Sequence, residues 1–172
     1  NKMTDEVGHL VLADNYKQTQ IVSIEQNIPN RINAHAWIIN HLEERGELDR
    51  EIEYLPSDNE ISLIMSEKSS LTRPEIAVLV AYSKNSAFAQ LCKYKIEDGK
   101  ILSRYLHNYF PTEYSKKFGK QIESHKLKNE ILATVLVNDF INMMGCSLFH
   151  QIMDEMSVGP DVIVRAFVAV KE

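Results

Sequence analysis

The sequence contains little glycine, and the six glycines that it has are scattered. Six among 172 residues is about half of the usual share of roughly 7%, and no two of them stand closer than 14 positions apart. A dinucleotide-binding fingerprint or a phosphate loop requires clustered glycines, because bare backbone amides must approach the phosphate. The composition therefore excludes a self-contained nucleotide-binding domain, and we expect no cofactor-binding residue in this chain.

Cysteine and long hydrophobic runs are also scarce. The two cysteines, Cys92 and Cys146, stand alone without CxxC or CxH spacing, and one possible pair does not make a disulfide scaffold. We expect two buried free thiols in a reducing compartment. No apolar run approaches the roughly 18–20 residues of a membrane span, and the N-terminus lacks a basic-then-apolar signal. We therefore expect a cytoplasmic protein without a membrane partner.

Positive charge is in deficit over the whole chain. The sequence has 19 Lys and Arg against 24 Asp and Glu, a net charge of −5, which disfavours nucleic acid as a partner. Residues 43–60 carry eight acidic and two basic side chains, whereas residues 116–128 carry five lysines and one glutamate. The basic stretch is either a solvated helix face or a contact surface for an anion or an acidic partner. Its candidate contact residues are Lys116, Lys117, Lys120, Lys126 and Lys128.

The sequence is well supplied with signals that begin and end helices. Residues 57–60 (SDNE) and 72–75 (TRPE) have the spacing of capping boxes, in which a Ser or Thr and a Glu satisfy each other's backbone amides. Pro74 stands in a first turn, where its missing N–H costs nothing. The pattern that follows predicts a helix over about 73–95. Gly46 is predicted to end an earlier helix in the left-handed conformation.

Two apolar stretches, ILATVLV at 131–137 and VIVRAFVAV at 162–170, are rich in residues that favour strands. From the first stretch onward, apolar side chains recur at helical steps and form one stripe. This stripe comprises Ile131, Leu132, Val135, Leu136, Phe140, Met143 and Met144. The second stretch has no convincing partner strand, so we predict a buried helix. The chain is thus predicted to be all-α, one domain over residues 1–172 that forms an irregular multi-helix bundle of about seven to nine helices.

Side chains that could carry chemistry do not form a recognisable motif. Glu6 and His9 make one ExxH, but a carboxylate-bridged metal pair needs two such motifs. No two histidines lie four residues apart, as a helical zinc pair would, and the sequence has no GxSxG elbow. We therefore expect no catalytic residue and no metal ligand, and we expect the histidines to be surface residues or hydrogen-bonded helix residues.

The other notable side chains are predicted to have structural roles. The available carboxylates, expected in caps or on solvated faces, are Asp58, Asp98, Asp139 and Asp154. Five aromatic residues are expected to anchor the core or, as the less favoured alternative, to dock another surface: Trp37, Tyr82, Tyr105, Tyr109 and Phe110. The chain begins without methionine and ends in an apolar segment around Phe167. We expect a piece of a longer polypeptide, in which part of that segment faces missing neighbours or another copy.

Ordered blocks along almost the whole chain resemble the large bacterial NAD-specific glutamate dehydrogenases. The blocks are LVLADNYKQTQIVS at 10–23, GELDREIEYLPSDNEI at 46–61, LTRPEIAVLVAYSK at 71–84, YFP at 109–111, ILATVLVNDFIN at 131–142 and DVIVRAFVAVKE at 161–172. The resemblance is weakest over 85–104, where KIEDGKIL stands in place of a proline-bearing acidic turn.

The resemblance implies a parent enzyme that oxidises L-glutamate with NAD and water to 2-oxoglutarate, ammonia and NADH. The family's nucleotide-binding glycines and catalytic lysine and aspartate would precede position 1, so no catalytic residue is carried over. Residues 1–25 would adjoin the catalytic region, and the remainder resembles the C-terminal helical region. The implied partners are the rest of the parent chain and further copies of it in a homo-oligomer.

The leading hypothesis is a non-catalytic helical segment of an NAD-dependent glutamate dehydrogenase, with a structural, assembly or regulatory role. The alternative is a free-standing helical module that binds a partner protein through the basic residues 116–128. A third possibility, a metal-dependent helical enzyme, predicts bound iron or zinc.

Overall fold

The computed structural model describes residues 2–94, 96 and 99–171, and these residues form nine helices and no strand. The all-α prediction is confirmed. Three residues of the segment where the family resemblance is weakest, Lys95, Glu97 and Asp98, lie outside the described residues. The helices are α1 (Lys2–Asn27), α2 (Ile32–Glu44), α3 (Asp58–Ser66), α4 (Arg73–Leu91), α5 (Lys100–Asn108), α6 (Thr112–Lys117), α7 (Gly119–Glu123), α8 (Lys128–Met156) and α9 (Pro160–Val170).

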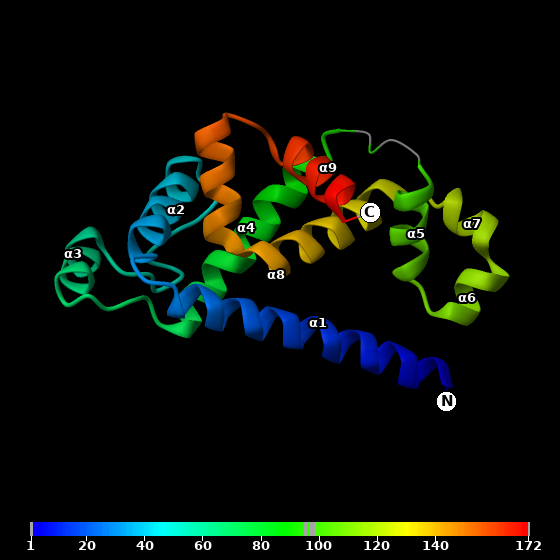
Figure 1. Cartoon of the computed structure of the whole chain (residues 1–172), viewed down its shortest axis with the longest axis horizontal. Coiled ribbons are helices and arrows are strands. Elements are labelled where there is room, and N and C mark those ends of the chain that lie inside the picture. The colour runs from blue at the N-terminus through cyan, green and yellow to red at the C-terminus, as the bar shows by residue number, and fades with distance from the viewer. Residues whose placement is uncertain (1, 95, 97–98, 172) are drawn as a thin grey trace.

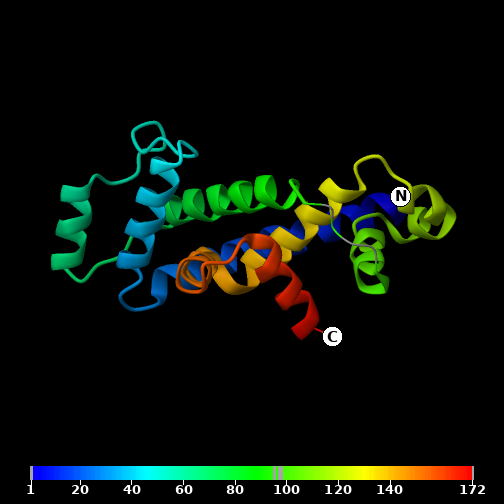
Figure 2. The ribbon, with the colours of Figure 1, turned by 90° about the horizontal axis from the view of Figure 1, so that it is seen from above.

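Three long helices, α1, α4 and α8, form the centre of an elongated molecule (Figure 1). Helix α8 packs against both α1 and α4, and α9 folds back onto α8 and α4. Helices α2 and α3 lie at one end of the molecule, and α5, α6 and α7 lie at the other end, as the view from above also shows (Figure 2). The long helices therefore connect two smaller helical groups.

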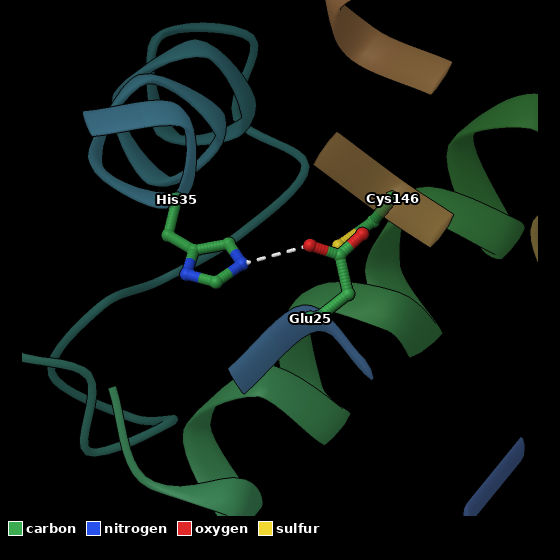
Figure 3. A group of neighbouring side chains, drawn as sticks. All are labelled: Glu25, His35 and Cys146. Carbon is green, nitrogen blue, oxygen red and sulfur yellow. Dashed lines mark hydrogen bonds and ion pairs between the residues drawn. The ribbon is translucent and has the colours of Figure 1, made fainter. Parts of the chain in front are cut away.

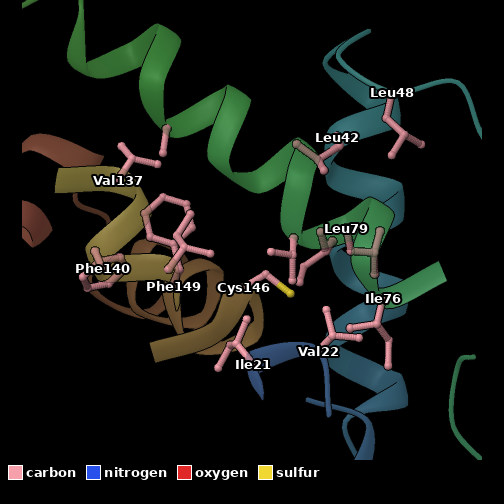
Figure 4. Close-up of a cluster of buried hydrophobic side chains, with 14 of the residues drawn as sticks. Ile21, Val22, Leu42, Leu48, Ile76, Leu79, Val137, Phe140, Cys146 and Phe149 are labelled. Atoms are coloured by element: carbon pink, nitrogen blue, oxygen red, sulfur yellow. The ribbon is translucent and has the colours of Figure 1, made fainter. Parts of the chain in front are cut away.

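The main hydrophobic core lies where α1, α2, α4, α8 and α9 meet (Figure 4). Ile39, Leu42, Leu79 and Ile141 are almost completely inaccessible to solvent there. Burial of an aliphatic side chain of this size stabilises the fold by about 1.5–3 kcal/mol. A second, smaller cluster of Leu106, Ile122 and Leu132 joins the α5–α7 group to the start of α8.

The predicted helix ends are largely confirmed. Ser57 Oγ accepts a hydrogen bond from the Glu60 amide at 3.4 Å, and the Glu60 carboxylate accepts one from the Ser57 amide at 2.8 Å. The equivalent amide-to-carboxylate bond before α4 is 2.6 Å long. Gly46 follows α2 with a φ of 65°. Helix α4 ends at Leu91, four residues before the predicted end.

The two apolar stretches are helical, but their buried faces differ from the predictions. In α8, Met143 is 52% exposed, although it was predicted to lie on the buried stripe. Because α8 packs against both α1 and α4, its buried face is wider and includes Ala133, Val137 and Ile141. Helix α9 is not buried all round: it packs one side on α8 and α4 and leaves Val170 in solvent.

Further predictions about burial were only partly correct. Tyr109 is 51% exposed and does not anchor the core, because it follows the last turn of the peripheral helix α5. Both cysteines are free, but Cys92 is only half-buried at the end of α4, whereas Cys146 is buried.

One described helix, α8, is long and apolar enough by length and composition to cross a membrane. Half of its most apolar stretch is buried against other helices. A core helix meets the same criterion, so this observation is weak evidence for a membrane span.

Candidate functional site

A break inside α8 admits a buried carboxylate from α1. Gly145 interrupts α8 with φ 83° and ψ 162°, a conformation that is not helical. A Cβ atom at this position would lie 2.0 Å from Oε1 of Glu25. Both the positive φ and the close approach of the carboxylate therefore require glycine here.

Glu25, near the C-terminal end of α1, is 1% exposed and binds the chain just beyond the break. Its Oε1 atom accepts a hydrogen bond from the Ser147 amide at 3.0 Å, and its Oε2 atom accepts one from Ser147 Oγ at 2.6 Å. The Ser147 amide follows the break in α8. The carboxylate thus acts as a cap, since the first amides of a helix have no intrahelical acceptor.

His35 of α2 is the third member of this cluster. Its Nε2 atom donates to Glu25 Oε2 at 3.3 Å, and its side chain is fully buried (Figure 3). Burial alone would raise the pKa of Glu25, but the hydrogen bonds from His35 and Ser147 outweigh it and hold that pKa below its usual value. The carboxylate is therefore ionised at neutral pH, and it links α1, α2 and α8 inside the core.

Cys146 of α8, directly after Gly145, completes the cluster. Glu25, His35 and Cys146 each offer one atom of a kind that binds metal ions, and these three atoms lie within 4.8 Å of one another (Figure 3). Burial, together with the charge of Glu25, raises the pKa of the Cys146 thiol well above its usual value. In this state the sulfur is a protonated thiol and not a nucleophile.

A second buried polar group lies nearby, centred on His150 in the last part of α8. Its Nε2 atom and Ser83 Oγ of α4 form a hydrogen bond of 2.9 Å. Burial and the neighbouring His41 lower the pKa of His150 to about 4. His41 stacks on Trp37 with ring centroids 4.5 Å apart. The neutral imidazole of His150 therefore serves the packing of α8 on α4 and α2.

Two open grooves, each of about 840 Å³, flank α1. The first lies among α1, α4 and α8 and contains Arg73 and Lys84 beside several amide side chains. Burial lowers the pKa of Lys84, and Asp14 opposes this effect. The second groove lies among α1, α5, α8 and α9 and is more apolar, with Val7, Leu10 and Val11 on its α1 side.

The structure places the predicted basic residues at the end of the molecule formed by α6, α7 and the start of α8. Four lysines are exposed there, namely Lys116, Lys117, Lys120 and Lys126. The fifth, Lys128, is half-buried and donates to Glu123 at 3.1 Å. Lys117 Nζ lies 5.2 Å from the centre of the Phe118 ring. Lys128 thus belongs to an ion pair within the chain.

Glu6 of the predicted ExxH pair is engaged elsewhere. Its carboxylate accepts hydrogen bonds from the Thr112 hydroxyl and from the Thr112 amide, the latter at 2.9 Å, and these two bonds lower the pKa of Glu6. Asp58 pairs with Arg50 at 2.7 Å, as expected of a structural carboxylate. Asp139 pairs with Lys171 of the chain end. Asp154 lies exposed on α8.

Sequence reasoning did not find the Glu25 cluster. Its members stand at positions 25, 35, 146 and 147, so no local spacing brings them together. The available signal was Gly145, a glycine within an otherwise helical apolar pattern. Such a glycine indicates a break or a close approach of another group.

The chain is similar to known proteins over almost its whole length. A sequence model of the family described as "Glutamate dehydrogenase, C-terminal" matches residues 68–172. The chain is 38% identical over 172 residues to the NAD-specific glutamate dehydrogenase of Pseudomonas aeruginosa, 33% over 171 residues to that of Halomonas elongata, and 34% over 168 residues to that of Mycobacterium tuberculosis.

These alignments cover 97–99% of this chain but only 10–11% of each relative. The chain thus spans about a tenth of the length of the relatives that it matches. More than half of its residues match the family model. Residues 68–172 match the model of the C-terminal region of glutamate dehydrogenases. The chain therefore belongs to the glutamate dehydrogenase family.

Proposed function

We propose that this chain is a non-catalytic helical segment of an NAD-dependent glutamate dehydrogenase. The supporting observation is its 38% identity, over 99% of its length, to an enzyme named for that activity. The parent enzyme would convert L-glutamate, NAD and water to 2-oxoglutarate, ammonia and NADH. In the part of the chain that the structure describes, the buried titratable clusters serve helix packing, and this supports a structural role.

The proposal identifies the rest of the parent chain as the partner of α1. The N-terminal half of α1 exposes a series of large apolar side chains to solvent: Val7, Leu10, Val11, Leu12 and Tyr16. Exposed apolar residues gathered along one helix indicate a contact with another protein surface. The more apolar groove beside this helix would receive a segment of the parent chain. We further propose that the parent is a cytoplasmic homo-oligomer in which residues 1–25 adjoin the catalytic region.

The substitution Leu12→Asp in the parent enzyme tests this role. Leu12 is 66% exposed in the segment, so the change should alter the free energy of unfolding of the 172-residue chain by less than about 0.5 kcal/mol. In the parent enzyme, by contrast, the new charge should be buried against the partner surface and should lower the melting temperature and the activity. Gln20→Asp, at another exposed position of α1, is the matched control. Equal behaviour of the two parent variants would contradict the proposed contact.

The alternative function, a partner-binding module, is favoured by the four exposed lysines at 116, 117, 120 and 126. Charge reversal of Lys117, Lys120 and Lys126 separates the two hypotheses. The leading proposal expects any effect to appear in the activity or assembly of the parent enzyme. Loss of capture of a separate acidic protein, with parent activity intact, would favour the alternative.

A further inference from the structure

We propose that Glu25, His35 and Cys146 form a structural zinc site that joins α1, α2 and α8. The three side chains come from three helices and converge in one buried position (Figure 3). A carboxylate, an imidazole and a thiolate are all established zinc ligands. This site is separate from the proposed function of the parent enzyme and would stabilise the segment whether or not that function is correct.

The distances suit a small tetrahedral ion. Two ligands bonded to zinc at about 2.0 Å lie roughly 3.3 Å apart in a tetrahedral arrangement. The observed separation of Glu25 Oε2 and His35 Nε2 is 3.3 Å. A ligand-type atom of each of the three residues lies within 4.8 Å of the others, and zinc binding would bring the Cys146 sulfur to about 3.5 Å from the oxygen and nitrogen ligands. The ion would lie among the three atoms and replace the hydrogen bond between Glu25 and His35.

The charges also balance. Zinc carries two positive charges, the carboxylate and the thiolate carry one negative charge each, and the imidazole is neutral. When the ion binds, the thiol proton of Cys146 leaves to solvent, and the ring proton of His35 moves from Nε2 to Nδ1, so that Nε2 binds the ion and the imidazole stays neutral. A group without net charge suits a position where all three side chains are buried, because an isolated charge in such surroundings is costly. Without the ion, Cys146 remains a protonated thiol beside an ionised carboxylate.

The surroundings hold the ligands in place. Ser147 donates to both oxygens of Glu25 and orients the carboxylate, as residues around a metal site commonly do. Thiolate and imidazole ligands favour zinc over magnesium or calcium, which prefer oxygen. A water molecule would supply the fourth ligand, because Ser147 Oγ is engaged with Glu25. Since the ligands are buried, the ion would enter as the chain folds, so that binding stabilises the folded state.

The test is to unfold the 172-residue chain with a chelator and refold it with zinc or with cobalt(II). We expect one zinc per chain by elemental analysis after removal of excess metal, and a higher unfolding midpoint than in the metal-free chain. Cobalt(II) should show the absorption of a tetrahedral site with a thiolate-to-metal charge-transfer band. Less than a stoichiometric amount of zinc, or a cobalt spectrum without that band, would overturn the proposal.

Variants assign the ligands. Cys146→Ala and His35→Gln should each lower the zinc affinity by at least roughly 100-fold, since loss of a supporting residue alone lowers affinity by about 10–100-fold. Cys92→Ala and His125→Gln are the matched controls, because Cys92 is half-buried elsewhere and His125 is exposed. Should Cys146→Ala fail to fold, the cobalt spectra of the unchanged chain and of Cys92→Ala still decide: the thiolate band must be present in both. Loss of the thiolate band in Cys92→Ala would show that Cys92, and not Cys146, binds the metal, and this would overturn the proposal.

Discussion

The two buried histidines, His35 and His150, occupy similar positions in the core and have different partners. Both are 2% exposed or less, and in the described part of the chain the Nδ1 atom of each has no hydrogen-bond partner. His35 meets the carboxylate of Glu25, whereas His150 meets the hydroxyl of Ser83. The first group includes a charge held in the core, and the second consists of neutral side chains.

The difference shows that the charge state of a buried polar group depends on its hydrogen-bond partners. The carboxylate of Glu25 is stabilised by the Ser147 amide and hydroxyl, which the break in α8 makes available. His150 has no carboxylate partner at hydrogen-bonding distance among the described residues, so burial and His41 keep it neutral. We therefore expect the free energy of unfolding to depend on side-chain size beside the Glu25 group and on a fall in pH at the His150 group.

The largest expected effect comes from Gly145→Ala, which would disrupt the Glu25 group. The new Cβ would meet the Glu25 carboxylate at 2.0 Å, and the backbone would keep an unfavourable φ of 83°. We expect a loss of about 4 kcal/mol in the free energy of unfolding, from backbone strain and displaced hydrogen bonds. Denaturant unfolding of the chain measures it. Gly46→Ala is the control, because Gly46 also has a positive φ but a Cβ added there would have no atom within 4 Å. This substitution should cost only about 1–2 kcal/mol.

A fall in pH tests the His150 group. The pKa of His150 is about 4 in the folded chain and 6.5 as a reference for the unfolded chain. The unfolded state therefore binds the proton first as the pH falls. Stability should decrease from pH 6.5 to about 4, by about 3 kcal/mol in total, and level off below. The measurement is the unfolding free energy against pH for the natural chain and for His150→Gln. Parallel curves for the two proteins would refute the assignment.

Glu25→Gln in the metal-free chain should have an intermediate effect. The amide keeps the size of the side chain but removes the charge that accepts from His35 and Ser147. We expect a loss of about 2 kcal/mol at neutral pH. Since the pKa of Glu25 is lowered on folding, this contribution is present above the unfolded value near 4.5 and disappears as the pH falls through the folded value. Glu44→Gln, at an exposed position of α2, should change stability little, and an equal loss in both variants would contradict the role of Glu25.

Ser83→Ala should have the smallest effect. It removes the partner of His150 Nε2 and leaves a buried nitrogen unpaired, which costs about 1 kcal/mol. With the hydroxyl gone, the acid-dependent loss of stability between pH 6.5 and 4 should persist, because burial is the main cause of the low pKa. Thermal unfolding at several pH values would check both points. A Ser83→Ala chain that no longer loses stability in acid would show that the hydroxyl, and not burial, controls His150.

The helices were predictable because their signals are local. The residues 57–60 and 72–75 carry their capping partners three positions apart, and Gly46 follows directly on the helix that it ends. The all-α class follows from such signals and from apolar spacing. Which face of each helix is buried depends on its neighbours, and this explains why Met143 and Tyr109 were assigned to the core and are exposed.

The Glu25 group was not predictable from the sequence for the same physical reason. Its hydrogen bonds join residues 122 and 10 positions apart, and only the packing of α1, α2 and α8 brings them together. A single sequence shows a glycine in a helix but not the side chain that occupies the break. The family, in contrast, could be recognised because its ordered blocks extend along the whole chain.

The most direct measurement of the proposed role is a titration of the 172-residue chain with NAD in the presence of L-glutamate. Calorimetry follows binding, and absorbance at the NADH band follows turnover. We predict no saturable binding at micromolar NAD and no formation of NADH, while the parent enzyme in the same buffer shows both. Micromolar binding of NAD, or NADH formation by the chain alone, would contradict the account of a non-catalytic helical segment.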